Sequence, residues 1–196
     1  GKRRHFPQSQ IPPHSPALTM IGASMLWVGW FGFNGGSALG ASGGAGMALL
    51  VTHIAAATAS LVWMGIEWVR FGRPSLVGIV TGMVAGLATV TPASGFIGVP
   101  GGLILGLAGG FGCYIAVDII RGKLKIDDSL DVFAVHGVGG IIGSLLVAFL
   151  ALPSFGGLGL ADGVTAGAQF MVQLQSVVIT VVWTLVVSVI ILMIAR

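Results

Sequence analysis

Residues 131–143 read Asp-Val-Phe-Ala-Val-His-Gly-Val-Gly-Gly-Ile-Ile-Gly and place one histidine, His136, in a run that otherwise holds apolar residues, glycines and a single serine as far as Leu152. If this run crosses a bilayer as a helix that rises about 1.5 Å per residue, the imidazole lies at least roughly 8 Å inside its start. An ionisable group is costly at that depth, so His136 predicts a functional site. The alternative is a histidine that bonds a neighbouring helix for packing alone.

The composition of the chain predicts an integral membrane protein. Of its 196 residues, 55% are hydrophobic and 8% are charged, and the mean hydropathy is +1.01. Soluble domains carry about 25% charged residues, so this chain lacks the charge to cover a water-facing surface. The net charge of +3 comes from separated clusters and not from one continuous stripe, which argues against nucleic-acid binding. The single cysteine, Cys113, excludes an intrachain disulfide and a multi-cysteine metal site.

Six stretches are long and apolar enough to cross a membrane, which takes about 20 residues. They cover approximately residues 18–38, 45–69, 75–93, 99–120, 131–152 and 169–195. We therefore predict an all-α membrane protein with a six-transmembrane-helix bundle, in which a cytoplasmic loop (1–17) precedes the membrane domain (18–196). The loop is polar and rich in proline, and the chain opens without an initiator methionine. We expect the chain to be a piece of a longer protein.

The basic residues predict the orientation. All nine Lys and Arg lie before the first span, between the second and third, between the fourth and fifth, or after the last. The opposite connections, near 39–44, 94–98 and 153–168, contain none. Because Lys and Arg mark cytoplasmic connections, both ends of the chain are predicted to be cytoplasmic.

The acidic residues have structural interpretations. Glu67 and Asp118 each stand three residues before an arginine, Arg70 and Arg121, and this spacing predicts local ion pairs. Three carboxylates gather where the fifth span begins and are expected to cap its N-terminus. They are Asp127, Asp128 and Asp131.

Glycines recur at four-residue intervals in the third span and again in the fourth. Such faces allow helix backbones to approach closely. The two rows are Gly78, Gly82 and Gly86, and Gly102, Gly106 and Gly110.

One face of the first span combines apolar, aromatic and hydroxyl side chains. Offsets of four, seven and eleven from Leu26 place Trp30, Phe33 and Ser37 on the same side of a helix. An aromatic face can attract a cation, and a hydroxyl can accept its hydrogen bond. The alternative is ordinary packing, because aromatic belts are common near membrane interfaces.

Two further polar side chains lie within the apolar spans. His53, in the second span, is interpreted as a packing residue or an outer-vestibule residue. Asn34 is expected to hydrogen-bond across helices.

Residues 29–38, Gly-Trp-Phe-Gly-Phe-Asn-Gly-Gly-Ser-Ala, together with 131–140, resemble the ammonium transporters of the Amt/Mep/Rhesus family. Connecting segments at 67–68, 72–75, 90–93 and 127–128 agree with this resemblance, which covers nearly the whole chain. The tryptophan–phenylalanine motif favours the Amt/Mep branch. The chain resembles the C-terminal half of these proteins, their sixth to eleventh spans.

The resemblance implies a fold and a function. Family members have eleven spans, the first ten in two inverted halves, and form homotrimers in the plasma (cell inner) membrane with one channel per subunit. They transport ammonium or ammonia and are not enzymes; no cofactor or metal is expected. A tail beyond the last span binds a P-II regulatory protein in many relatives.

The resemblance also assigns roles on the first span. Ser37 matches the outer site that recruits substrate, and Phe33 matches one of two gate phenylalanines. Trp30 matches a pore-lining tryptophan, and Leu26 matches part of the apolar pore wall.

On the fifth span, His136 matches the second member of a hydrogen-bonded histidine pair and Val132 a further part of the apolar wall. Asp131 matches a structural aspartate near the cytoplasmic start of the pore helix. The partner histidine, the other gate phenylalanine and an outer tryptophan belong to the first half of the family fold, so this chain alone is not expected to complete the pore.

A dry pore favours the neutral species. Stripping water from an ammonium ion costs several kcal/mol in a low-dielectric site, whereas an aromatic face returns about 0.5–2 kcal/mol. Two alternatives differ in class: a non-transporting ammonium sensor or membrane scaffold, and a membrane-embedded enzyme. The enzyme is disfavoured because the sequence offers His136 neither a second catalytic group near mid-membrane nor a set of metal ligands. A Rhesus-like passage of neutral gas is a variant of transport.

Overall fold

The computed structural model describes Phe6 and residues 13–195, and all regular secondary structure in that part of the chain is helical. Most of the predicted 1–17 loop lies outside the described residues. The α-helices are α1 (Pro16–Gly36), α2 (Gly43–Phe71), α3 (Leu76–Val90), α4 (Val99–Val117), α5 (Val138–Leu150) and α6 (Ala166–Ile194). The π-helical segments η1 (Asp118–Lys123) and η2 (Phe133–Gly137) follow α4 and precede α5, and η3 (Pro153–Phe155) is a short 3₁₀ turn.

Five helical segments of the described chain are long and apolar enough to cross a membrane: Pro16–Gly36, Gly43–Phe71, Val99–Lys123, Phe133–Leu150 and Ala166–Ile194. The exception is α3, whose 15 residues rise only about 22 Å against a hydrocarbon core of about 30 Å. The sequence predicted a longer span at 75–93. The helix ends early because Pro92 has no N–H to donate to the carbonyl four residues before it, and residues 91–96 form turns instead.

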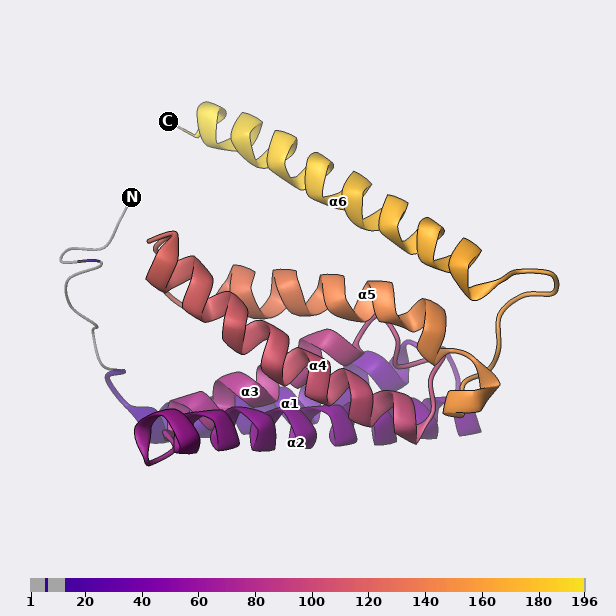
Figure 1. The fold of residues 1–196 in the computed structure, drawn as a ribbon, viewed down its shortest axis with the longest axis horizontal. Coiled ribbons are helices and arrows are strands. Elements are labelled where there is room, and N and C mark those ends of the chain that lie inside the picture. The colour runs from indigo at the N-terminus through magenta and orange to yellow at the C-terminus, as the bar shows by residue number, and fades with distance from the viewer. Residues whose placement is uncertain (1–5, 7–12, 196) are drawn as a thin grey trace.

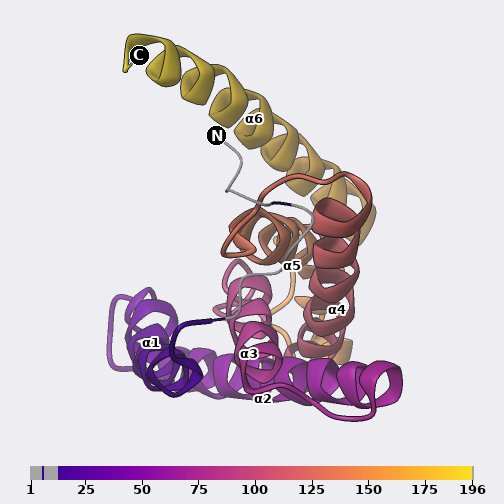
Figure 2. The same cartoon turned by 90° about the vertical axis from the view of Figure 1, so that its left-hand side faces the viewer.

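Helix α2 is the element against which α3 and α4 pack, and Figure 2 shows both helices on the same side of it. A Cβ atom added to Gly82 of α3 would lie 2.6 Å from the Cβ of Trp63, and one added to Gly106 of α4 would lie 2.7 Å from the Cβ of Thr58 and 2.8 Å from the carbonyl oxygen of Ala55. Real Cβ atoms do not approach so closely. The prediction that the glycine rows allow close helix contacts is confirmed, and both rows face the same helix.

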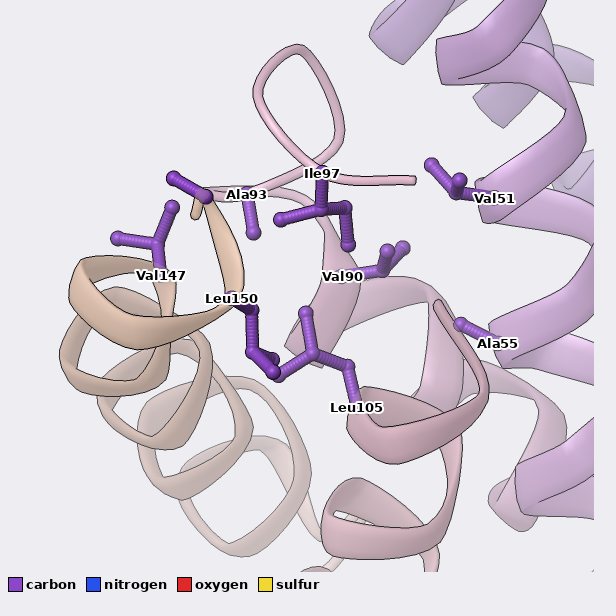
Figure 3. Close-up of a cluster of buried hydrophobic side chains, with 9 residues drawn as sticks. Val51, Ala55, Val90, Ala93, Ile97, Leu105, Val147 and Leu150 are labelled. Atoms are coloured by element: carbon purple, nitrogen blue, oxygen red, sulfur yellow. The ribbon is translucent and has the colours of Figure 1, made fainter. Parts of the chain in front are cut away.

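A buried cluster ties α2, α3, α4 and α5 together, and most of its members are labelled in Figure 3. Val51 comes from α2, Val90 from α3, Leu105 from α4 and Leu150 from α5. Ile97, in the connection between α3 and α4, packs against the same cluster. The cluster therefore fixes α5, which continues from the turn that carries His136, relative to α2, α3 and α4.

Helix α6 diverges from the rest of the bundle, as Figure 1 shows. None of its residues is buried, and near its start Phe170 packs against Phe149 of α5 with ring centroids 5.6 Å apart. A helix that is apolar on all sides suits a membrane environment and not water. Its end and the start of α1 lie on the same side of the bundle (Figure 1).

Two arginines at helix ends bond carboxylates from other segments of the chain. Arg70 lies 3.9 Å from Asp118, and the guanidinium of Arg121 bonds both carboxylate oxygens of Asp131 at 3.1 and 3.2 Å. The carboxylate of Glu67 instead accepts the Ser75 N–H at 2.6 Å. The predicted ion pairs from Glu67 to Arg70 and from Asp118 to Arg121 were therefore wrong.

The reason lies in the packing of the helix ends. Arg70 meets Asp118 at the start of η1, and Arg121 meets Asp131 in the connection that follows η1. The carboxylate of Glu67 holds the turn into α3. These contacts gather the basic connections at one end of the bundle. At the other end, the Leu158 N–H donates to the carbonyl of Phe96 at 3.1 Å and joins two connections that lack Lys and Arg.

Asp128 caps the helix that carries His136. Its two carboxylate oxygens accept the N–H groups of Val132, Phe133 and Ala134 at 2.8, 2.9 and 3.1 Å. These are donors that the start of a helix leaves without intrahelical partners. The prediction of an aspartate cap is thus confirmed for Asp128.

We predict that Gly106→Ala destabilises the bundle, because its Cβ would meet the backbone of α2. Overpacking of this kind costs about 1–3 kcal/mol, which a lower thermal unfolding midpoint in detergent would report. Gly65→Ala is the matched control, since a Cβ there has nothing within 4 Å and alanine is favoured over glycine in a helix by about 1 kcal/mol. Equal midpoints for both variants would contradict the close α2–α4 contact.

We also predict that Asp128→Ala lowers the free energy of unfolding by about 1–2 kcal/mol, the usual cost of a lost N-cap. Asp128→Asn keeps one acceptor oxygen and should lose less. Asp162→Ala, in the exposed connection before α6, serves as the control. If Asp128→Ala and Asp162→Ala lower the free energy of unfolding equally, the capping role of Asp128 is refuted.

Candidate functional site

Trp30 is the best-anchored aromatic side chain on the predicted face of α1. Its indole Nε1 donates to the Thr91 hydroxyl at 2.8 Å, and that hydroxyl donates in turn to the carbonyl of Leu87 at 2.7 Å. Thr91 lies at the end of α3, so the bond ties α1 to α3. The half-buried indole is thereby held in one orientation, with its polar edge occupied.

The Trp30 ring contacts two other rings. It stacks on the imidazole of His136 with centroids 6.3 Å apart and an interplanar angle of 24°. It meets Phe33 edge to face, with centroids 5.8 Å apart and an angle of 70°. The structure therefore brings together three of the predicted site residues, which come from α1 and from η2.

This aromatic group lies on an open face of the chain. His136 is exposed, and Phe33 is 59% exposed. Leu26 and Val132 stand about one helical turn from Trp30 and His136 along the same two helices and are also more than half exposed. The described residues thus form an open surface and do not enclose a cavity.

Ser37 is the C-cap residue of α1 and lies next to the aromatic group. Its hydroxyl donates to the carbonyl of Phe33 at 2.6 Å. Because the hydroxyl proton is used inside the protein, its oxygen presents acceptor positions outward. An exposed acceptor beside an exposed phenyl ring suits a small cation.

Asp131 lies at the start of the His136 helix with φ of +53° and is joined to Arg121. The side chains of this pair are 16% and 31% exposed. The contact of Arg121 Nη1 with both carboxylate oxygens holds the connection between η1 and η2, five residues before the imidazole. The pair can fix the position of the helix start.

His53 lies apart from this group, on α2. Its ring packs against Trp27 and Phe31 of α1, with centroids 5.1 and 6.0 Å apart. These contacts agree with the packing interpretation. The expected interhelical bond of Asn34 is confirmed, because its Nδ2 donates to the Thr52 hydroxyl at 2.9 Å.

Two features of the site were not predicted. Thr91 was not expected to contact Trp30, and the bond that it makes joins positions 61 residues apart, for which a single sequence contains no signal. The π-helical form of η2 was also missed, because apolar periodicity does not distinguish a π turn from an α turn. In the described part of the chain, no three His, Cys, Asp or Glu residues are grouped so that they could hold a metal ion.

The chain is similar to known ammonium transporters. A model of the Ammonium Transporter Family matches residues 1–196. The ammonium transporter Amt1 of Archaeoglobus fulgidus is 53% identical over 157 residues, which are 80% of this chain and 40% of that protein. The chain spans less than half the length of the curated relatives that it matches.

Solved structures agree in fold. Mep2 of Saccharomyces cerevisiae superposes with a TM-score of 0.82 and 36% identity over 92% of this chain and 44% of its own. A structure titled Sensor Amt Protein gives a TM-score of 0.83 and 34% identity over 93% of this chain and 44% of its own. The all-helical architecture, the family match and these superpositions show that the chain belongs to the ammonium transporter family.

Proposed function

We propose that the chain forms one wall of a hydrophobic path for ammonium or ammonia, with His136 as one of a pair of pore histidines. The observation that carries this proposal is the stack of His136 on Trp30 on an exposed face. A mid-span imidazole turned toward an open surface is costly in lipid, so the surface needs a partner wall. The remainder of a full-length family member would supply that wall.

The path would begin at Ser37 and Phe33. The Ser37 oxygen can accept a hydrogen bond from a small cation while the phenyl face attracts its charge. Together these groups replace only part of the hydration that an ammonium ion loses on leaving water. They fit a site that recruits the ion and not one that holds it tightly.

Beyond the entry, the wall offers little to a charged species. Trp30 contributes only its apolar ring, because its N–H is bonded to Thr91, and Leu26 and Val132 are aliphatic. The stack on Trp30 uses the face of the His136 ring and leaves the nitrogens at its edge directed elsewhere. A neutral imidazole can donate or accept one hydrogen bond without adding charge. This arrangement suits a neutral solute that has left its proton at the entrance.

The assembly and location follow the same proposal. We infer a multi-pass protein of the plasma (cell inner) membrane, with spans near the predicted ranges and both ends of this chain cytoplasmic. A homotrimer of the full-length protein and regulation by a P-II protein stay predictions from the family resemblance.

A second candidate function is ammonium sensing without transport, or a membrane scaffold. The superposition on a protein titled as a sensor favours it. The same Ser37–Phe33 entry would then bind ammonium as a signal. Specific binding with no flux would distinguish the sensor from the transporter, and current per ammonium moved would distinguish ion transport from gas passage.

We predict that His136→Ala in the full-length protein reduces ammonium flux into proteoliposomes or changes the preference for ammonium over methylammonium. Loss of one positioned hydrogen-bonding group should cost about 10-fold or more. His53→Ala, a second histidine within the helices, is the control. Unchanged flux and preference in His136→Ala would remove the residue from the path.

Ser37→Ala is predicted to act at the entrance. Without the acceptor oxygen, the KM for ammonium should rise about threefold to tenfold while the maximal flux changes little. Ser42→Ala, at the N-cap of α2, controls for loss of a helix-end hydroxyl. A fall in maximal flux at constant KM would assign Ser37 a different role.

A further inference from the structure

The turn that carries His136 is π-helical and is bonded differently from an α-helix. The Val138 N–H donates to the carbonyls of both Phe133 and Val135. Single π turns of this kind are rare and are frequent at functional sites. Because an α-helix advances about 100° per residue, collapse of the π turn by one residue would rotate the imidazole away from Trp30. The orientation of the His136 imidazole therefore depends on the contacts that hold this π turn in place.

Cys113 of α4 contacts the turn directly. The thiol is fully buried and donates to the carbonyl of Val135 at 3.6 Å. Val135 immediately precedes His136, so the bond is made at the backbone beside the imidazole.

Thr89 of α3 lies near the Cys113 thiol in the buried interior. Its side chain is fully buried, and its hydroxyl does not donate to a backbone carbonyl. By contrast, the hydroxyls of Thr81 and Thr91 donate to carbonyls four residues back. A Cβ added to Gly139 of α5 would lie 2.9 Å from the Thr89 hydroxyl and 3.3 Å from the Cys113 sulfur. The Thr89 hydroxyl and the Cys113 thiol thus both lie close to Gly139, three residues beyond His136.

We propose that Cys113, backed by Thr89, is a positioning residue that holds the π turn of η2 and so sets the direction of the His136 imidazole. The thiol touches neither the aromatic group nor any substrate on the open face. It acts through the Val135 carbonyl. The inference rests on the proposed function only for its effect on flux, because the thiol bond can be observed without transport.

The bond is tested first by infrared spectroscopy of the full-length protein. The S–H stretch lies apart from other protein bands, and the difference between wild type and Cys113→Ser isolates the Cys113 signal. We expect the lowered frequency of a hydrogen-bonded thiol. The frequency of a free thiol would overturn the proposal, whatever the protein transports.

The second test compares flux and the ammonium-to-methylammonium ratio in three variants. Cys113→Ala should lower flux about threefold to tenfold and change the ratio, because the donor is lost. Cys113→Ser, which keeps a donor, should restore both. Val51→Ala opens space in the buried cluster of α2 without touching η2 and should leave the ratio unchanged.

The outcomes separate the two proposals. If Cys113→Ala keeps the wild-type flux and ratio, or if Cys113→Ser is as impaired as Cys113→Ala, the positioning role is overturned. A folded wild-type protein that moves no ammonium overturns the proposed function instead, and the thiol band still decides whether Cys113 holds the turn.

Discussion

The close approach of α3 and α4 to α2 is the constraint on which the rest of the structure depends. Between lipid-exposed helices, burial of apolar area gives little driving force, because lipid tails are as apolar as leucine. Backbone proximity and complementary packing must supply the attraction instead. Gly82 and Gly106 provide it by removing the side chains that would separate these helices from α2.

This packing sets the positions of the groups that orient the candidate site. With α3 fixed on α2, Thr91 lies where the indole of Trp30 can reach it, and Asn34 meets Thr52 across the α1–α2 contact. With α4 fixed beside α3, Cys113 lies against the backbone of η2. The aromatic group on the open face is thus held by polar bonds made on its buried side.

Much of this arrangement can be predicted from the sequence, because periodicity and composition are local properties. The helical segments, the two glycine rows and the aspartate cap at Asp128 follow from residues close together in the chain. The ion-pair partners of Arg70 and Arg121 do not follow from nearby residues, because each partner depends on which segment of the chain packs beside the arginine. The early end of α3 could have been inferred from Pro92, but the Thr91–Trp30 bond and the π turn depend on tertiary packing.

The chemistry of the open face follows from the hydrogen bonds that its polar groups already make within the protein. The Trp30 N–H and the Ser37 O–H both donate to acceptors within the protein, so neither adds a donor to a solute that passes over them. On the proposed path, a cation would be bound only at the entrance, through the Ser37 oxygen and the Phe33 ring. Deeper along the wall, the His136 ring is held through its face and keeps a hydrogen-bonding edge among aliphatic neighbours. Under the proposed function, a solute that crosses such a surface would gain one hydrogen bond and no compensation for charge, and this difference would favour ammonia over any ion of similar size.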